Sequence, residues 1–427
     1  MNDHHATPGD GRHRARTLGI VVGTLPPGPL NAITDVEGVL VGHTTLDDGA
    51  DLHTGVTAVV PRQLTRHALP AAVHTGNGYG KLVGSTQIDE LGVLESPIVL
   101  TATLSVFRAA DALLTYLMRM HPDGLSFNPV VGETNDGHLS DIRRRPITEQ
   151  HVLDAVDGAS GGLPAEGCVG AGTGTTALGF KAGIGTSSRR LLVNGTPITV
   201  GALVQSNFGG LLTLQGTPIP PPTPGPTPEP VPGPAKAAGR LPEADHAERI
   251  SRLPETDHGE PADGVPEGGQ GEPDGNSCMI VVATDAPLDA RRLGRLARRA
   301  IFAMGRVGAA YAHGSGDYAI AFSTASPHLP PLADAYLNPV FAAVMDAVEE
   351  ALLNSLLTAT TTTGVHGRTS HALPYDRLPA TSPTPEPATT EPASPPATEP
   401  AASETEPETD AETPASKTVT PDTRKGA

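Results

Sequence analysis

The sequence of 427 residues contains no tryptophan, and aromatic residues make up only 3% of it. A chain this poor in large rings must build its core from aliphatic side chains. Only two cysteines are present, Cys168 and Cys278, which is too few for a disulfide framework or a thiolate metal site. The low cysteine content favours a reducing compartment, and we predict a cytoplasmic protein.

Long apolar runs are also missing. No run of about 18 apolar residues occurs, and no apolar segment typical of a secretion signal follows residues 1–17. We therefore predict no membrane partner. Lysine and arginine form no runs with interleaved aromatic side chains, which disfavours nucleic acid as a partner.

The patterns of metal and cofactor sites are absent too. The 16 histidines show neither an HExxH motif nor a paired spacing with cysteine. The run Gly-Ala-Gly-Thr-Gly-Thr at 170–175 is similar to a dinucleotide fingerprint, but its third glycine comes one position early. We predict no metal and no cofactor.

Proline and acidic residues are concentrated in two stretches. Residues 217–275 hold 15 of the 44 prolines and 11 acidic against 4 basic residues, and residues 376–427 hold 10 acidic against 4 basic residues. Such stretches cannot bury a core. The other 316 residues are ample for one. We predict a disordered N-terminus at 1–17, a single domain at 18–375 interrupted by a processing loop at 217–275, and a disordered tail at 376–427.

The predicted domain alternates strands and helices. β-branched runs bounded by Gly or Pro predict strands at 18–22, 39–41, 56–61, 98–103, 198–204, 278–284 and 318–322. Apolar residues at helical spacing predict helices from 106, with Ser105 as N-cap, at 288–306 and at 340–357. Several strands precede the first helix, and neither side of the proline-rich loop forms a complete alternation alone. A linker that joins two independent domains would give a similar pattern, but this order favours one α+β domain interrupted by a long loop.

A serine stands where the acidic loop meets a buried strand, because Asn276-Ser277 directly precedes the apolar run 278–284. N-terminal nucleophile enzymes place their nucleophile at such a junction and cut the preceding peptide bond themselves. Cleavage between Asn276 and Ser277 would free an α-amine with a pKa of about 7.7 to 8.0. That amine is a base within the same residue as the hydroxyl nucleophile. From the pattern alone, a serine at the start of a strand by chance remains the alternative.

A broader resemblance favours the first interpretation. The chain resembles the DmpA-type family of L-aminopeptidases/D-esterases and β-peptidyl aminopeptidases in eight segments, in the same order along the chain: 31–46, 94–106, 128–143, 170–189, 204–210, 276–300, 314–324 and 349–364. The proline-rich stretch falls where this family has its processing loop. The resemblance therefore identifies Ser277 as the candidate nucleophile.

The resemblance also implies a fold and an assembly. It implies a four-layer αββα sandwich of the N-terminal-nucleophile-hydrolase type, with a disordered insert and tail. It further implies that the precursor cleaves itself into two subunits that stay associated, and that the processed pairs form a homo-tetramer.

Carried over residue by residue, the resemblance assigns roles at the site. Ser277 attacks the substrate carbonyl, and Asn207 donates its side-chain amide to the oxyanion. Ser315 and Asp317 hold the new α-amine. Taken alone, Asn207 before Phe-Gly-Gly and the Gly-Ser-Gly-Asp run at 314–317 equally suit turns.

A second segment, Gly-Glu-Thr-Asn-Asp-Gly at 132–137, lies near the active site in this family. Glu133, Asn135 and His138 are therefore candidate substrate-binding residues, although a turn with exposed acids, including Asp136, also explains the segment. Family members often carry an aromatic residue near the position of His138, which leaves details of the substrate pocket open.

We predict a self-processing serine aminopeptidase or amidase that releases N-terminal residues from short peptides, amino-acid amides or esters through an acyl-enzyme on Ser277. Two alternatives stay open. One is an N-acyltransferase, because the related ornithine acetyltransferase fold uses a threonine nucleophile. The other is a non-catalytic scaffold whose proline-rich tail is the functional part.

Overall fold

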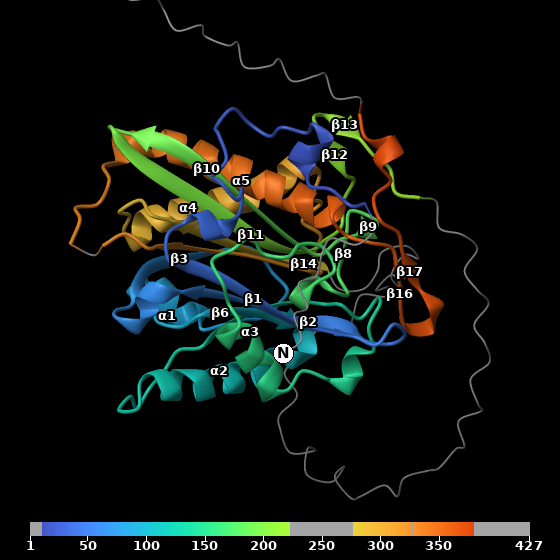
Figure 1. Cartoon of the computed structure of the whole chain (residues 1–427), viewed down its shortest axis with the longest axis horizontal. Helices are drawn as coiled ribbons and strands as arrows, with labels where there is room; N and C mark the ends of the chain where they lie inside the picture. Colours follow the sequence, from blue (N-terminus) through green and yellow to red (C-terminus); the bar gives the residue numbers. More distant parts are fainter. Residues whose placement is uncertain (1–10, 223–275, 327, 380–427) are drawn as a thin grey trace, which may run out of the picture. The chain divides into compact units, whose positions relative to one another are not determined.

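Two β-sheets lie face to face in the middle of the structure, and helices cover the outer face of each sheet (Figure 1). The computed structural model describes residues 11–222, 276–326 and 328–379. All of these residues belong to one compact unit. The predictions for 223–275, for 380–427 and for residues 1–10 lie outside the described residues.

The first sheet has the strand order β1-β2-β6-β7-β4, with bounds Val39–Asp47, His53–Pro61, Ile98–Ala102, Val130–Thr134 and Leu82–Val83. The second sheet has the order β10-β11-β14-β15-β3-β5, with bounds Ile184–Val193, Thr196–Asn207, Asn276–Thr284, Ser315–Ser323, Leu69–Gly78 and Val93–Leu94. Short ribbons pair β8 (Thr176–Ala177) with β9 (Phe180–Lys181), β12 (Thr213–Leu214) with β13 (Thr217–Pro218), and β16 (Thr362–Thr363) with β17 (Thr369–Ser370). The α-helices of the described chain are α1 (Ser85–Leu91), α2 (Val106–Met120), α3 (Glu149–Asp157), α4 (Ala290–Met304) and α5 (Leu337–Leu357).

Three apolar cores fill the spaces between the four layers. One core joins the two sheets and includes Leu100 of β6, Met279 of β14 and Ile320 of β15. A second lies between the second sheet and helices α4 and α5, and a third lies between the first sheet and helices α2 and α3. The inner strands β2, β6 and β15 are covered on both faces and are buried along their whole length. The predicted four-layer αββα sandwich is confirmed.

Most predicted elements are present, and one predicted strand is wrong. The segment 18–22 is not a strand, because a short 3₁₀ turn at Ala15–Leu18 ends at Gly19 in the left-handed region (φ 75°). Ser105 does precede α2, but its side chain makes no capping hydrogen bond, since its backbone is already helical (φ −101°, ψ −8°). Capping geometry requires an extended N-cap residue.

The N-terminal segment is folded closer to the start of the chain than predicted. Arg12 donates to the carbonyl oxygen of Leu373 at 3.0 Å, and Arg14 forms an ion pair with Glu166 at 2.6 Å. The predicted boundary at Thr17 therefore lies inside folded structure.

The two sides of the proline-rich stretch meet in one sheet. β11 precedes that stretch and β14 follows it, and the two strands pair antiparallel from Val200 opposite Thr284 to Asn207 opposite Ser277. β14 then pairs parallel with β15. The segments that flank the stretch therefore form the centre of the second sheet.

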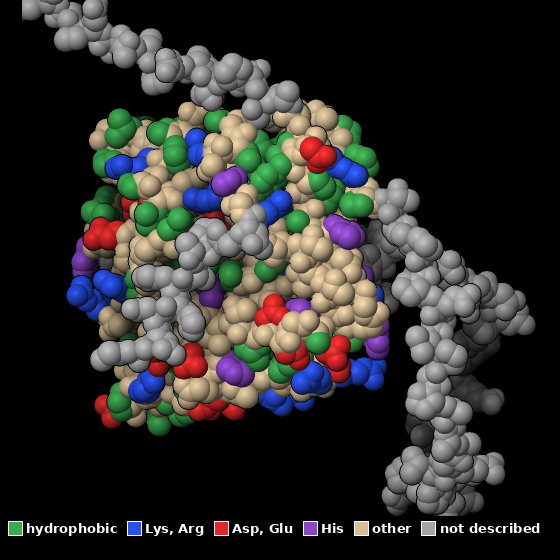
Figure 2. Space-filling view, turned by 45° about the vertical axis from the view of Figure 1, so that its right-hand side comes forward, with side chains coloured by type: hydrophobic (Ala, Val, Ile, Leu, Met, Phe, Trp, Pro, Cys, Tyr) green, Lys and Arg blue, Asp and Glu red, His purple; other side chains and the backbone are tan. Residues whose placement is uncertain are grey.

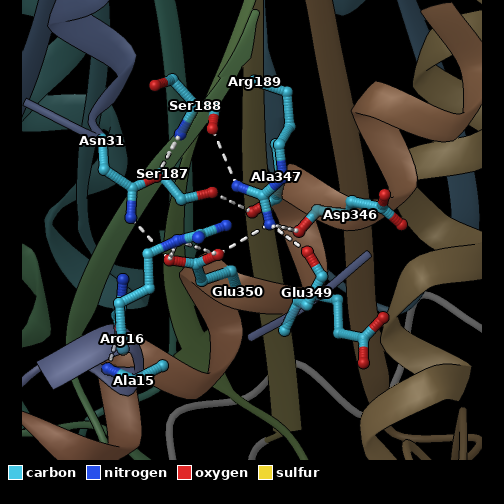
Figure 3. Close-up of polar contacts among 12 residues, drawn as sticks. Ala15, Arg16, Asn31, Ser187, Ser188, Arg189, Asp346, Ala347, Glu349 and Glu350 are labelled. Atoms are coloured by element: carbon cyan, nitrogen blue, oxygen red, sulfur yellow. Dashed lines mark hydrogen bonds and ion pairs between the residues drawn. The ribbon is translucent and has the colours of Figure 1, made fainter. Parts of the chain in front are cut away.

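Helix α5 is fixed to this sheet by buried charges (Figure 3). The side chains of Arg189 on β10 and Glu350 on α5 are both fully buried, and they lie 2.7 Å apart. Arg16 and Asn31, from the N-terminal segment, also donate to the Glu350 carboxylate. A buried ion pair needs such additional hydrogen bonds to offset its desolvation.

No helix of the described residues is long and apolar enough to cross a membrane. On the face shown in Figure 2, basic and acidic side chains lie close together on a largely neutral surface.

Candidate active site

The predicted catalytic residues lie at one end of three neighbouring strands. In the register of the second sheet, Ser277 of β14 is directly opposite Asn207 of β11 on one side and Gly316 of β15 on the other. Ser315 and Asp317 flank Gly316. Residues that are 70 and 39 positions away from Ser277 in sequence are therefore its immediate neighbours in space.

Strand alternation places the side chains of Ser277 and Asn207 on the same face. Met279 and Val281 of β14, like Leu203 of β11, belong to the core between the sheets. Ser277 and Asn207 have the same parity as these residues, so both side chains point toward the first sheet. Opposed residues in antiparallel strands have Cβ atoms about 4.5 to 5.5 Å apart. The side chains of Asn207 and Ser277 are therefore neighbours on one face of the sheet.

The hydrogen bonds of Asn207 determine which way its amide faces. Its Oδ1 accepts from the main-chain N–H of Thr176 at 3.0 Å, and its Nδ2 donates to the carbonyl oxygen of Asn135 at 3.1 Å. A main-chain N–H needs an acceptor, so the side-chain atom of Asn207 that faces Thr176 is the amide oxygen. The NH₂ group of Asn207 is then on the other side of the amide, where it acts as a donor. Thr176 was not predicted as a site residue, although it lies in the glycine-rich segment that carries the family resemblance.

Ser315 and Asp317 form a buried pair on the other face of the sheet. The Ser315 hydroxyl donates to Oδ1 of Asp317 at 2.7 Å. Ala319 and Ala321, which share the parity of this pair, pack in the core under α4 and α5. The main-chain nitrogen of Ser277 lies in the plane of the sheet, between this pair and the Ser277 hydroxyl.

Burial raises the pKa of Asp317 to about 6, because desolvation outweighs its hydrogen bonds from Ser315 and the Cys278 main chain. The pKa of the buried Cys278 thiol is raised well above its usual value by burial and then by Asp317. Cys278 is therefore a neutral thiol beside the site and is unsuited to act as the nucleophile.

Glu133 approaches the site from the first sheet, at the end of β7. Its Oε1 accepts from the Lys81 main-chain N–H at 3.0 Å, and Lys81 Nζ lies 3.4 Å from the same oxygen. Its Oε2 is buried and has no hydrogen-bond partner among the described residues. A Cβ atom added to Gly80 would lie 3.2 Å from both Glu133 Oε1 and the Cα of Gly316. The carboxylate is thus close to the strand that pairs with Ser277.

Asn135 and His138 line a cavity next to Asn207. The cavity holds about 450 Å³ and is bounded by the segment after β7 and by residues 365–368. Burial, and then Arg368, lowers the pKa of His138. The structure therefore brings Asn135 next to Asn207 and places His138 in a cavity beside it.

Asp136 is a buried acid and not an exposed turn residue. Only 2% of it is exposed, and desolvation raises its pKa to about 7, with a smaller contribution from the charge of Glu133. Burial of this kind cannot be inferred from the segment Gly-Glu-Thr-Asn-Asp-Gly itself, because acids in such a run are usually exposed.

Two further residues support the site and were missed from the sequence. Lys81 positions Glu133. Gln205, fully buried on β11, donates to Thr134 Oγ1 at 2.8 Å and to the Ala171 carbonyl at 2.9 Å, which ties the two sheets together beside the site. Gln205 lies two residues before Asn207, and this was its only sequence signal; Lys81 lies 52 residues before Glu133 and had none.

The glycine-rich run 170–175 is explained by packing. A Cβ atom at Gly172 would lie 2.4 Å from the main-chain nitrogen of Ile184, and one at Gly174 would lie 2.0 Å from the carbonyl oxygen of His53. These glycines let main chains approach closely. In the part of the chain that the structure describes, no three His, Cys, Asp or Glu side chains converge as metal ligands.

A four-layer αββα sandwich with a candidate hydroxyl nucleophile near the start of a central strand defines the class of N-terminal-nucleophile-like hydrolases. Comparisons with known proteins give the family. The sequence model of peptidase family S58 matches residues 31–370. The chain belongs to this family, which makes it a hydrolase of peptide bonds.

Known relatives match this chain over nearly their whole length. The β-peptidyl aminopeptidase BapA of Sphingosinicella microcystinivorans is 37% identical over 389 residues, which cover 86% of this chain and 91% of the relative. A solved β-aminopeptidase from Burkholderia sp. has a TM-score of 0.69 at 33% identity and covers 86% of this chain and 97% of its own. The L-aminopeptidase D-Ala-esterase/amidase of Ochrobactrum anthropi, a variant of the Ntn hydrolase fold, has a TM-score of 0.68 at 33% identity, covering 85% and 96%. These matches favour neither the acyltransferase nor the scaffold alternative.

Proposed function

We propose that the chain is a self-processing serine aminopeptidase that cuts itself between Asn276 and Ser277. The mature enzyme then releases N-terminal residues from short peptides, amino-acid amides or esters. The observation that carries this proposal is the pairing of Ser277 with Asn207 on one side and with the Ser315-Gly316-Asp317 segment on the other.

Self-processing uses the hydroxyl of Ser277. Its Oγ attacks the carbonyl carbon of Asn276, the peptide C–N bond breaks, and the chain is held by an ester while the nitrogen of Ser277 becomes an amine. Water then hydrolyses the ester and leaves a carboxylate on Asn276 and a free hydroxyl on Ser277. The amide of Asn207 supports this step because it is fixed as a donor beside the hydroxyl.

Catalysis uses the same groups a second time. The α-amine takes the Ser277 hydroxyl proton as Oγ attacks the substrate carbonyl, and Asn207 donates to the resulting oxyanion. The amine returns the proton to the leaving nitrogen, and water hydrolyses the acyl-enzyme. We assign to the Ser315–Asp317 pair the task of orienting the α-amine, because it lies across the strand from the hydroxyl.

Glu133 supports an aminopeptidase in preference to an endopeptidase. A buried carboxylate whose Oε2 has no partner in the described structure is a site for a cation. We propose that it binds the ammonium group of the substrate. Since the relatives are by name a β-peptidyl aminopeptidase and an L-aminopeptidase D-Ala-esterase/amidase, both α- and β-amino acyl substrates belong in the first screen.

The processed fragments are expected to stay together. A cut before Ser277 leaves β10, β11, β3 and β5 in the first fragment and places β14 and β15, which lie between them, in the second. The fragments interleave within one sheet, so separating them would break two strand ladders. We also propose a homo-tetramer of processed pairs in the cytoplasm, which sedimentation velocity and cell fractionation would test.

Intact mass spectrometry under denaturing conditions tests the proposal. The parent protein should give two chains of 276 and 151 residues, whereas Ser277→Ala should give one chain of 427 residues. Ser323→Ala is a matched control, because it removes a buried hydroxyl at the far end of β15 and should process normally. Two chains of these sizes from Ser277→Ala would exclude this mechanism. An enzyme that cleaved N-acetylated peptides as fast as free ones would contradict the aminopeptidase assignment.

A further inference from the structure

A cationic cavity lies beside the candidate acyl site. Its polar lining includes Asn135, His138, Asp141, Arg143, His366 and Arg368. Asn135 places the cavity, because its carbonyl oxygen accepts from the Nδ2 of Asn207, and Asn207 is directly opposite Ser277. The cavity therefore begins at Asn135, the residue that is hydrogen-bonded to the proposed oxyanion donor.

The charge of this lining is opposite to that of the chain. The whole protein carries a formal net charge of −18, but the cavity presents two guanidinium groups and one carboxylate. Guanidinium groups match carboxylates by bidentate hydrogen bonding. Burial, and then Arg368, lowers the pKa of His138, which favours an imidazole that offers hydrogen bonds over one that adds charge.

The main chain holds one wall of the cavity in an unusual conformation. His366 has φ 59° and ψ 23°, the left-handed region that residues with a Cβ seldom adopt. Its neighbours are held by main-chain hydrogen bonds from Val365 to the Leu139 carbonyl at 2.8 Å and from Gly364 to the Arg368 carbonyl at 2.9 Å. Arg368 also donates to the Gly137 carbonyl at 3.3 Å. Strained main chain that surrounding structure maintains is concentrated at ligand sites.

The positions of the charged groups indicate which part of a substrate would enter. Glu133, assigned above to the substrate ammonium, lies toward Gly316 and β15, whereas the cavity lies on the Asn207 side of Ser277. The acyl residue thus occupies the Glu133 side, and the leaving group points to the cavity. In an unblocked dipeptide, the carboxylate lies only about 3.5 Å, one residue length, beyond the scissile nitrogen.

We propose that this cavity is the subsite for the leaving residue and that Arg143 and Arg368 bind its carboxylate. This inference rests on the proposed aminopeptidase function. It predicts that the enzyme prefers substrates whose leaving residue is anionic to neutral amides of the same sequence. The negative charge can come from a free α-carboxylate or from an acidic side chain.

The test compares three substrates that share one acyl residue X: X-Gly with a free carboxylate, X-Gly-NH₂, and X-Glu-NH₂. The measured quantity is the ratio of kcat/KM for each anionic substrate to that for X-Gly-NH₂. We expect a ratio of at least about 10 in the parent for one or both anionic substrates, and a ratio near one in the double variant Arg143→Gln/Arg368→Gln. A high ratio for X-Gly alone assigns the subsite to the α-carboxylate, and a high ratio for X-Glu-NH₂ alone assigns it to the side chain.

Both kcat/KM values in a ratio come from the same enzyme preparation, so a lower fraction of active enzyme changes both equally and leaves the ratio unchanged. Arg119→Gln is the control, because Arg119 is a half-exposed arginine paired with Asp157 on α2 and α3, outside the cavity; it should keep the parent ratio. If the double variant fails to process, Arg143→Gln alone, which alters an exposed side chain, should still lower the ratio. Ratios near one in the parent, or ratios unchanged in the variants, would overturn the inference. Failure of the proposed function itself would look different, because no amide would be turned over at all.

Discussion

Glu350 and Glu133 are both buried carboxylates, yet their surroundings differ. Both oxygens of Glu350 accept hydrogen bonds, from Arg16, Asn31 and Arg189 (Figure 3). Glu133 uses Oε1 for Lys81, but its Oε2 has no partner within the described ranges. Asp317 resembles Glu133, since its Oδ1 accepts from Ser315 and its Oδ2 is buried without a hydrogen-bond partner there.

The difference fits a structural role for Glu350 and the ammonium-binding role proposed for Glu133. A buried acceptor without a partner costs about 1–3 kcal/mol, so a carboxylate in that state is stabilised when a cationic ligand arrives. The carboxylate of Glu350 has no such capacity left. Substituting each glutamate by the isosteric glutamine should therefore affect different properties.

The largest effect is expected from Glu350→Gln. Removing this charge leaves Arg189 and Arg16 without their anion, and breaking a buried ion pair in this way costs about 3–5 kcal/mol. Urea unfolding in the unprocessed Ser277→Ala background measures the change on a single chain. Glu90→Gln, at an exposed position of α1, is the matched control and should stay within about 0.5 kcal/mol. A loss below about 1 kcal/mol at Glu350 would show that the cluster is not structural.

Asn207→Ala should affect the chemical step. Losing one oxyanion donor lowers kcat by about 10²- to 10³-fold, or roughly 2.7–4 kcal/mol. The rate is measured on the fraction of enzyme whose second chain begins at Ser277. Asn128→Ala removes an amide that is bonded to the Gly84 carbonyl and should leave kcat nearly unchanged. An unchanged kcat in Asn207→Ala would remove Asn207 from the mechanism.

Glu133→Gln should weaken recognition of the substrate ammonium. A hydrogen bond to a charged group contributes about 1.5–3 kcal/mol, so kcat/KM for free-amine substrates should fall about 10- to 100-fold. The free energy of unfolding should not fall, in contrast to Glu350→Gln. If stability falls and kcat/KM stays constant, the distinction between the two glutamates does not hold.

The smallest effect concerns pH. Burial raises the pKa of Asp136 from its usual 3.8 to about 7, so the folded state binds a proton that the unfolded state has already released. Stability from this group is complete below pH 4 and is lost as pH rises toward 7. Asp136→Asn should therefore gain about 1 kcal/mol relative to the parent between pH 5 and pH 6. Parallel urea curves at the two pH values measure this difference, and a constant difference would mean that Asp136 ionises normally.

Much of the fold was predictable because the signals are local. Short apolar, β-branched runs indicated β1, β2, β6, β11, β14 and β15, and helical spacing indicated α2, α4 and α5. The failure at 18–22 has a physical reason. An apolar run forms a strand only if a neighbouring strand pairs with it, and here the chain turns at Gly19 before it can pair.

The candidate site was predictable in part. Ser277 stands out at the junction of an acidic loop and a buried strand, and resemblance to a family supplied Asn207, Ser315 and Asp317. The partners of those residues were not predictable, because Thr176 and Lys81 reach Asn207 and Glu133 only through contacts between distant segments.

The amino-acid order alone determines which residues are candidates for the site: a hydroxyl ahead of an apolar strand, an amide where a strand ends in a polar turn, and acids next to glycines. It does not determine which of them meet. The pairing of Asn207 with Ser277, the faces on which Ser277 and Asp317 lie, and the cationic cavity beside them all depend on strand register and on how two sheets pack. Register and packing arise from contacts between residues far apart in the chain, and such contacts exist only after folding.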